Sequence, residues 1–323
     1  MTQLSATAPI AAVFMVEPGA YEWPAILLVA SLRAFASDDV RLYAYCRDSL
    51  IDQLHPDTLA FLEAQQVTLR PISPAFAVIY PQGNKLYACA DPRPEAATVL
   101  FDTDMFMLQP AMLSRTLVAG AVSGRPTGNW MWGKTPQDWE PAYASVDLPL
   151  PHRRMSRPDE SFTLPSMSAG YVAYTEPAFG RIWRDTALTI EARRLARGIY
   201  PTLDQISLPV AAELLGLHLN MIEVGWNKAG RITPQAIRDV IFYHYQKAQT
   251  LLDLPVKWLA DRLLAEYSRW PNVEALLSFY EAEAARPPSV VNNAGWRDVV
   301  LAEQRGVDIS HGKATGYVWK PKS

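Results

Sequence analysis

The chain is short of the residues that mark several large classes of protein. Its 323 residues include two cysteines, Cys46 and Cys89, which cannot build a disulfide framework, so we expect a reducing, cytoplasmic location. Thirty basic residues face 33 acidic ones, and this balance offers no basic excess to hold nucleic acid. With 49% hydrophobic and 20% charged residues, the composition is typical of a packed globular protein and not of a disordered chain.

Apolar runs long enough to cross a membrane are also missing. The first apolar run, Pro9–Val16, ends at Glu17-Pro-Gly and falls far short of the roughly 20 residues that a membrane helix needs. The run also lacks the basic flank and the small-residue cleavage site of an export signal. We therefore expect no transmembrane segment, and peripheral membrane contact through a later amphipathic helix stays open.

The first hundred residues alternate between strand-like and helix-like stretches. Short apolar segments typical of buried strands lie at residues 10–16, 40–46, 67–72 and 98–101. Segments with helical spacing separate them, at residues 21–35, 56–66 and 85–90. This alternation predicts an α/β, Rossmann-like fold with a mixed, mainly parallel sheet and helices on both faces. In such sheets ligands bind beyond the carboxyl ends of the strands, which directs attention to Glu17 and Asp102.

The rest of the chain is less regular. Further strands are expected at residues 117–123, 168–174 and 237–245. Further helices are expected at residues 179–197, 204–215, 256–267 and 273–285. Residues 124–165 are rich in proline, tryptophan and charge with little periodicity, which is typical of a lid or binding loop.

Two aspartates follow the strand expected at residues 98–101. Side chains two apart on an extended segment point the same way, so Asp102 and Asp104 can converge on one ion. Carboxylates suit Mg²⁺ or Mn²⁺, which would neutralise charge on a departing diphosphate. A neutral His244 would complete a nitrogen and oxygen site that favours Mn²⁺. A solvated turn at the aspartates and a packed histidine are the plainer alternatives.

Several pieces of the sequence follow the order of a known family. Leu100-Phe-Asp102-Thr-Asp104 resembles the Asp-x-Asp signature of nucleotide-sugar glycosyltransferases of the GT-A fold, especially glycosyltransferase family 8, the glycogenin-like group. Four more pieces are similar to that family's motifs: Asn84-Lys85-Leu86, Ser168-Ala-Gly170, Leu203-Asp204-Gln205 and His244-Tyr-Gln-Lys247. The resemblance implies a GT-A-like catalytic domain at residues 1–250, followed by a mostly helical C-terminal extension at residues 251–323 that matches no known motif.

The resemblance implies a cation and a nucleotide donor. Asp102, Asp104 and His244 would hold Mn²⁺ (or Mg²⁺) on the diphosphate of a nucleoside-diphosphate sugar, with a UDP-sugar as the expected donor. Lys85 and Lys247 would add positive charge at the phosphates. The late motif departs from the family, because the Gly and the Pro-Trp that accompany the family's lysine are missing around Lys247.

Other motif residues are implied to bind the sugar. Ser168 and Gly170 stand where the family has an Asn-x-Gly strand that faces the donor sugar, so serine replaces the asparagine. Asp204 and Gln205 match the Asp-Gln pair that contacts the sugar, and they are the implied catalytic residues. Family 8 transfers with retention, so the resemblance implies retention. Glu17, at the end of the first strand, stands where a doubly wound sheet places the base and ribose.

The same positions also have structural interpretations. Asp204 follows Pro-Thr-Leu and suits the N-cap of the helix expected at residues 204–215. Lys85 is equally interpretable as a solvated helix residue, and the turn after Glu17 as an ordinary strand-to-helix connection. Spacing alone does not separate these interpretations from the functional ones.

One segment fits a different nucleotide motif. Gly128–Thr135 matches G-x-x-x-x-G-K-[ST], the phosphate-binding P-loop. Arg125-Pro-Thr separates it from the preceding strand, and Pro136 and Pro141 interrupt the helix that should follow, which makes a P-loop the least favoured interpretation. The aromatic cluster here fits a lid, a sugar platform or a buried patch, and consists of Trp130, Trp132 and Trp139.

These observations favour a metal-dependent glycosyltransferase that moves a sugar from a nucleoside diphosphate to a carbohydrate or other hydroxyl acceptor. Nucleic acid is not an expected partner. A non-catalytic nucleotide-sugar binding protein on the same scaffold is the main alternative, and a P-loop nucleotide hydrolase is the third. The acceptor, the donor base and the oligomeric state have no signature in the residues.

Overall fold

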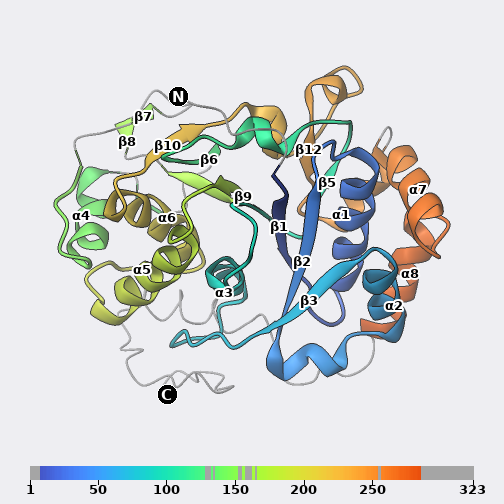
Figure 1. The fold of residues 1–323 in the computed structure, drawn as a ribbon, viewed down its shortest axis with the longest axis horizontal. Helices are drawn as coiled ribbons and strands as arrows, with labels where there is room; N and C mark the ends of the chain where they lie inside the picture. Colours follow the sequence, from blue (N-terminus) through green and yellow to red (C-terminus); the bar gives the residue numbers. More distant parts are fainter. Residues whose placement is uncertain are drawn as a thin grey trace, which may run out of the picture.

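A seven-stranded sheet forms the centre of the molecule (Figure 1). The structure is a computed structural model that describes residues 8–127, 132–133, 135–151, 155–156, 162–163, 166–253 and 256–284. The strands are ordered β10 (His218–Met221), β6 (Ala121–Pro126), β9 (Met167–Tyr174), β4 (Ala97–Phe101), β1 (Ile10–Met15), β2 (Val40–Arg47) and β3 (Val67–Ile72). β9 is antiparallel to both of its neighbours, and the other six strands run parallel.

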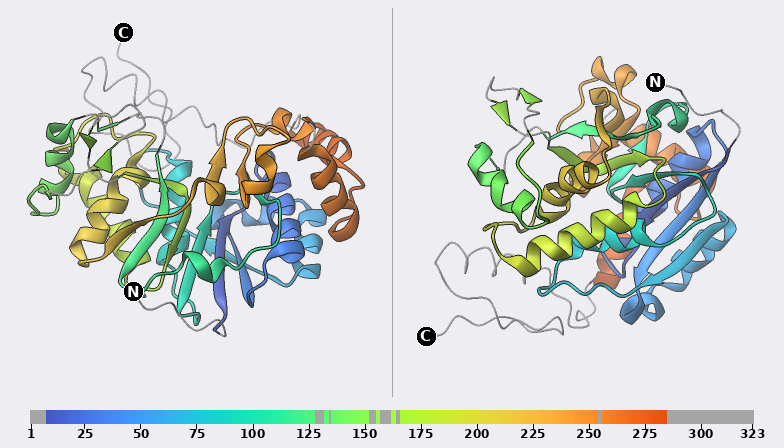
Figure 2. Two further views of the ribbon diagram at one scale, coloured as in Figure 1. Left: turned by 90° about the horizontal axis from the view of Figure 1, so that it is seen from above. Right: turned by 60° about the vertical axis from the view of Figure 1, so that its left-hand side comes forward.

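Helices cover both faces of the sheet (Figures 1 and 2). One face carries α1 (Glu22–Phe35) and α2 (Pro56–Ala64). The other carries α3 (Asn84–Ala90), α5 (Phe179–Arg193), α6 (Leu203–Leu214) and α4 (Pro136–Ala144). Because strand side chains alternate, β1 contributes Ile10, Ala12 and Phe14 to the first core and Ala11 and Val13 to the second. A strand buried on both faces needs a continuous apolar run, which explains its sequence.

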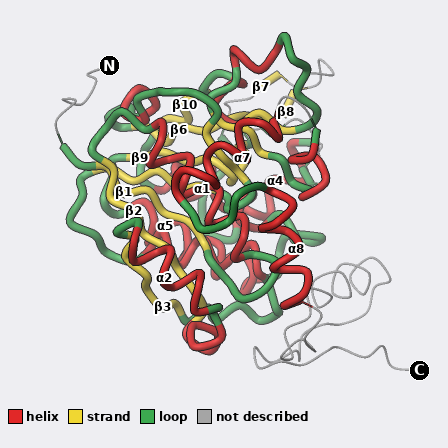
Figure 3. The backbone as a smooth tube through the Cα atoms, turned by 90° about the vertical axis from the view of Figure 1, so that its right-hand side faces the viewer, coloured by secondary structure: helices red, strands yellow, loops and turns green. Residues whose placement is uncertain are grey.

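The C-terminal helices α7 (Val256–Tyr267) and α8 (Val273–Ala284) pack outside α1 and α2 (Figure 3). Leu263 and Leu276 are buried in the same core as the sheet-facing side of α1. The Tyr280 hydroxyl hydrogen-bonds that of Thr58 on α2. The division of the chain at residue 250 stays a prediction. Within the described ranges, no helix combines the length and the apolar character that a membrane crossing requires.

A small second sheet lies beside the carboxyl end of β4. It joins β11 (Lys228–Ala229), β12 (Phe242–His244) and β5 (Met105–Met107). β5 follows β4 after the two-aspartate turn, and its antiparallel register sets His244 opposite Met105. A separate pair, β7 (Met155–Ser156) and β8 (Phe162–Thr163), completes the described strands.

The predicted α/β class and helix-covered parallel sheet are confirmed, and four local expectations need correction. The strand expected at 117–123 begins at Ala121, because the chain turns at residues 119–120, where Gly120 has φ of 71°. The helix expected to reach residue 197 ends at Arg193, where Arg194 turns left-handed with φ of 53°. Of the strand expected at 237–245, only β12 is extended.

The fourth correction concerns the segment expected to be irregular between residues 124 and 165, which contains α4. Pro136 takes the first position of this helix, where its missing N–H costs nothing. The Asp138 carboxylate accepts a hydrogen bond from the Thr135 N–H at 2.7 Å and so caps the helix start. Pro141 is accommodated inside the helix, although proline there was expected to interrupt it.

Candidate active site

A cavity of about 330 Å³ opens at the carboxyl ends of β1 and β4. The sheet order reverses here, because the chain steps outward from β1 to β2 and β3 on one side and returns with β4 on the other. Its lining residues come from four segments that are distant in sequence: Met15, Glu17, Ala20, Tyr21, Trp23, Pro24, Pro81, Gln82, Asn84, Lys85, Asp102, Thr103, Asp104, Tyr245, Gln246 and Ala248.

Asp102, Asp104 and His244 come together at one edge of this cavity. His244 Nε2 lies 3.1 Å from Asp104 Oδ1 and 3.8 Å from Asp102 Oδ2. One ligand atom from each residue lies within 4.8 Å of the others. In an octahedral site with bonds of about 2.1 Å, neighbouring ligands are about 3.0 Å apart and opposite ones about 4.2 Å. The trio therefore has the spacing to hold one divalent cation, with further positions left for phosphate oxygens.

Backbone contacts fix this arrangement. The Asp102 N–H donates to the Gly170 carbonyl at 2.7 Å, and the Tyr245 N–H donates to the Asp104 carbonyl at 3.1 Å. Gly170 also leaves space, because a Cβ on it would lie 2.9 Å from His244 Cε1 and 3.0 Å from Asp102 Oδ2. The glycine of the Ser-Ala-Gly motif therefore lets β9 approach the two candidate ligands.

Asn227 orients the imidazole of His244. Asn227 is buried, and its amide donates to Ser168 Oγ at 3.2 Å, which assigns its oxygen as the acceptor toward His244. That oxygen lies 3.1 Å from His244 Nδ1. With the proton on Nδ1, the lone pair of Nε2 faces the carboxylates, as a metal-binding histidine requires.

Charges within the trio shift the pKa values of His244 and Asp104. Burial alone lowers the pKa of His244, but the hydrogen bond and charge of Asp104, with the charge of Asp102, outweigh it and raise the pKa. Burial raises the pKa of Asp104, and the bonded His244 outweighs that effect and lowers it. The lowered pKa of Asp104 favours its ionised form, which can bind a positive group.

Lys85 joins this trio to Asp204. Its ammonium contacts Asp102 Oδ1, lies 3.3 Å from Asp204 Oδ2 and donates to the Ala169 carbonyl at 3.3 Å. An ammonium has three N–H groups, and each has an acceptor here. Burial lowers the pKa of Lys85, but the charges of Asp102 and Asp204 outweigh it and raise the pKa. Lys85 is thus a buried cation and not a solvated helix residue.

Asp204 is also buried, and it is not the N-cap of α6. The helix begins at Leu203 with Thr202 as its N-cap, so Asp204 stands in the first turn. The Tyr80 hydroxyl donates to Asp204 Oδ1 at 2.8 Å and accepts from the Asp204 N–H at 3.0 Å. Burial is the main cause that raises the pKa of Asp204, against the opposing charge of Lys85. The N-cap interpretation is wrong because two long-range partners hold the carboxylate.

Glu17 lines the same cavity from the end of β1. Its carboxylate accepts two hydrogen bonds of 2.8 Å from Arg47 and one of 2.8 Å from the Asn84 amide. Such a bidentate pair fixes the plane of the carboxylate and links the carboxyl ends of β1 and β2. Arg47 stands at the end of β2, so its place could have been inferred from the rule that directed attention to Glu17.

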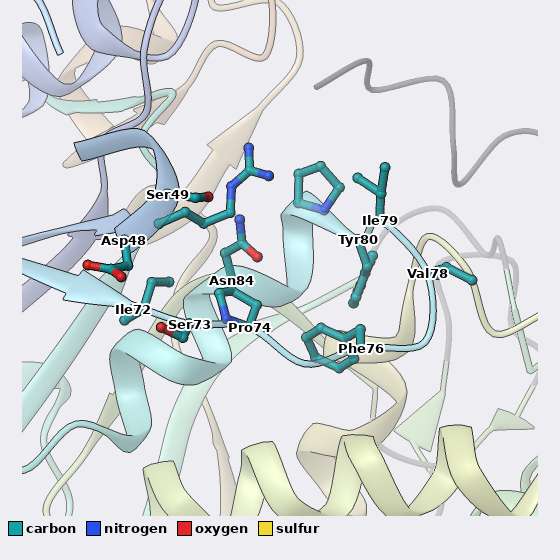
Figure 4. A pocket seen from close by; sticks show the side chains of 12 residues that line it. Asp48, Ser49, Ile72, Ser73, Pro74, Phe76, Val78, Ile79, Tyr80 and Asn84 are labelled. Atoms are coloured by element: carbon teal, nitrogen blue, oxygen red, sulfur yellow. The ribbon is translucent and has the colours of Figure 1, made fainter. Parts of the chain in front are cut away.

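A second cavity of about 270 Å³ adjoins the first at Pro81 and Asn84, which line both. Figure 4 shows it between Asp48 and Ser49 on one side and Phe76 and the following loop on the other, with Asn84 between them. Together the two cavities follow the carboxyl ends of β1, β2 and β4.

The other predicted site residues, Ser168, Gln205 and Lys247, are not among those that line either cavity. Ser168 is half-buried on β9 and accepts from the Gly170 N–H at 3.3 Å as well as from Asn227. Gln205 is half-buried beside Asp204 on α6. Lys247 is exposed and follows Gln246, which has φ of 59°. Their roles stay predictions.

The P-loop interpretation falls mostly on residues 128–131 and 134, which lie outside the described residues, as does Trp130. The described part offers no open helix start for a phosphate, because the Asp138 carboxylate already occupies the N-terminus of α4. Trp139 is buried against Trp132 with ring centroids 4.9 Å apart, and its N–H donates to the Gly133 carbonyl. The buried patch is the correct interpretation for Trp139, and Trp132 is half-buried beside it.

Sequence reasoning missed several polar residues of the site. Asn227 lies in a 3₁₀ turn (Val224–Asn227), and Tyr80 precedes another (Pro81–Gly83). Neither position carries a periodic or motif signal. Tyr245 and Gln82 were missed as well, although Tyr245 directly follows His244 in a segment already singled out.

Comparison with known proteins identifies a family for this chain. No curated protein matches the chain. A family described as the Rhodobacterales glycosyltransferase domain matches residues 12–216, which extend from β1 through α6 and include Asp102, Asp104, Lys85 and Asp204. The match covers more than half of the chain, and the chain therefore belongs to this glycosyltransferase family.

Proposed function

We propose that this glycosyltransferase is metal-dependent and takes a nucleoside-diphosphate sugar as its donor. The observation that carries the proposal is the convergence of Asp102, Asp104 and His244 at the edge of the cavity beyond β1 and β4. Two carboxylate oxygens and an imidazole nitrogen suit Mn²⁺ or Mg²⁺, with Mn²⁺ favoured by the nitrogen ligand. The cation, when bound, would stabilise the negative charge of the departing diphosphate.

The roles of the other site residues are also proposals, based on the family resemblance and supported by the side-chain contacts. Lys85 holds Asp102 and Asp204 in place and adds a positive charge beside the diphosphate. Asp204, with Gln205, would orient the donor sugar through its hydroxyl groups, since a carboxylate held by Tyr80 and Lys85 is preorganised to accept hydrogen bonds. Glu17 would lie beside the base or ribose, and Lys247 near the phosphates.

Membership of a particular glycosyltransferase family, and the stereochemistry that it implies, is also a proposal. The order of the motifs resembles glycosyltransferase family 8, which would make the transfer retaining and a UDP-sugar the expected donor. Product stereochemistry, followed by nuclear magnetic resonance of the anomeric proton, tests retention directly.

A binding and hydrolysis experiment tests the function. The wild-type protein is screened by thermal shift with nucleoside diphosphates, UDP-sugars, ATP and GTP, each with Mn²⁺, Mg²⁺ or chelator. We expect stabilisation by a nucleoside diphosphate only with the divalent cation, and slow hydrolysis of the matching sugar donor. Asp104→Asn should lower that hydrolysis about a hundredfold or more, since a metal ion supplies several kcal/mol to such a transition state.

Asp185→Asn is the matched control, because Asp185 makes only exposed ion pairs on α5. Unchanged binding and turnover in Asp102→Asn and Asp104→Asn would show that the metal assignment is wrong. Binding without turnover by the wild-type protein favours the non-catalytic alternative. Stabilisation by ATP or GTP with Mg²⁺, and not by a sugar nucleotide with Mn²⁺, favours the P-loop alternative.

A further inference from the structure

Two buried polar atoms belong to residues that line the first cavity and have no hydrogen-bond partner. They are the Tyr245 hydroxyl oxygen and Gln82 Oε1, two of the four such buried side-chain atoms among the described residues. Tyr245 is 3% exposed. A buried polar atom without a partner is destabilising, so its presence beside a cavity indicates a bound group that completes it.

Tyr245 has its side chain packed in an aromatic cluster beside Asp104. Its backbone N–H is bonded to the Asp104 carbonyl at 3.1 Å, and its ring lies against Trp23 and Phe106, with centroids 5.6 and 6.0 Å away. The phenol is therefore held in the cavity wall next to a candidate cation ligand.

We propose that the Tyr245 hydroxyl binds the diphosphate of the donor by donating a hydrogen bond to one of its oxygens. This inference rests on the proposed function, because Asp104 would place the cation, and with it the diphosphate, beside Tyr245. Ionised phosphate oxygens only accept hydrogen bonds, and a tyrosine phenol keeps its proton at neutral pH, so donor and acceptor are matched. Gln82, in the turn that precedes Asn84, accepts with its amide oxygen, so its partner is a group that donates, as the ribose hydroxyls do.

The test compares Tyr245→Phe with Tyr243→Phe. Tyr243 is buried in the same aromatic cluster, at a centroid distance of 6.3 Å from Tyr245, and is not one of the residues that line the cavity. Calorimetry with Mn²⁺ and UDP, or whichever nucleoside diphosphate the wild-type protein binds best, should give a Kd about tenfold to a hundredfold higher for Tyr245→Phe and an unchanged Kd for Tyr243→Phe.

Two further measurements distinguish a role of the Tyr245 hydroxyl in ligand binding from a role in stabilising the fold. The ligand-free melting temperature of Tyr245→Phe should equal or exceed that of the wild type, because the substitution removes a hydroxyl that has no partner. Binding of Mn²⁺ alone and of uridine should be unchanged in Tyr245→Phe, whereas Gln82→Met should weaken uridine as well as UDP.

The outcomes divide cleanly. Equal UDP affinity in Tyr245→Phe and the wild type overturns the inference while leaving the proposed function intact. A lower ligand-free melting temperature with loss of Mn²⁺ binding overturns it too, since the hydroxyl would then be structural. If no nucleoside diphosphate binds the wild-type protein with Mn²⁺, the proposed function fails and the inference fails with it.

Discussion

The sharpest perturbation of the candidate cation site is a single methyl group at Gly170. A Cβ at this position would lie 2.9 Å from His244 Cε1, 3.1 Å from His244 Nδ1 and 3.0 Å from Asp102 Oδ2. Ordinary contacts begin at 3.4 Å, so both side chains must move by several tenths of an ångström. Both are candidate cation ligands, and the methyl group enters from the side on which β9 approaches them.

The expected cost to the fold is small because two effects oppose each other. Replacing glycine by alanine inside a strand gains about 0.5–1 kcal/mol of backbone entropy. Crowding a packed site loses about 1–3 kcal/mol. Gly170→Ala should therefore fold, with a net loss of about 0–2.5 kcal/mol. Affinity for Mn²⁺ should fall about tenfold to a hundredfold, the range seen when the orientation of metal ligands is disturbed.

Calorimetric titration of the ligand-free protein with Mn²⁺ measures the effect. Gly124→Ala is the control, because Gly124 lies on β6 of the same sheet and its Cβ would meet the flexible end of Met167 at 2.8 Å and the Tyr171 carbonyl at 3.1 Å, but no candidate ligand. Equal Mn²⁺ affinity in Gly170→Ala, Gly124→Ala and the wild type would refute the assignment of Asp102 and His244 to one cation.

Two further predictions concern neighbouring groups. Asn227→Ala should weaken Mn²⁺ binding about tenfold to a hundredfold by freeing the His244 ring, whereas Asn220→Ala, which removes a similar side-chain hydrogen bond on β10, should leave the titration unchanged. Burial raises the pKa of Glu191 from 4.5 to about 7, so its contribution to stability is fully present below pH 4.5 and lost as the pH rises through 7. Glu191→Gln should therefore match the wild type in denaturant unfolding below pH 4.5 and exceed it by up to about 3 kcal/mol above pH 7, and a difference independent of pH would contradict this account.

Six of the seven strands of the large sheet were predictable from sequence because their signals are local, whereas β10 at its edge was not expected. β1 is buried on both faces and so reads as an unbroken apolar run, and each crossover helix has its own spacing. The error at α4 occurs where a local rule meets a compensating contact. Pro136 and Pro141 were taken as helix breakers, but a proline at the first helical position and a capped helix start allow α4 to form.

The candidate site was predictable only in part, for the same reason. Asp102 and Asp104 follow a strand whose end is visible in the sequence, so their place could be inferred from topology. The sequence does not indicate that the three N–H groups of Lys85 contact Asp102, Asp204 and a backbone carbonyl, because those partners are distant in the chain. The role of Asn227 could not be predicted for the same reason, since the sequence of a short turn does not specify that its amide contacts the His244 ring.

Charge balance links the separate parts of the site. With the three carboxyls of Asp102, Asp104 and Asp204 ionised and His244 neutral, the single positive charge of Lys85 leaves the cluster with a net charge of −2. One divalent cation neutralises that charge, and it would bind on the side of Asp102 that faces His244, since Lys85 occupies the other oxygen. Without a cation, a proton on His244 is the available substitute, which is why the neighbouring carboxylates raise the pKa of His244. The same electrostatic demand thus explains the shifted histidine, the buried lysine and the geometry that suits a metal ion.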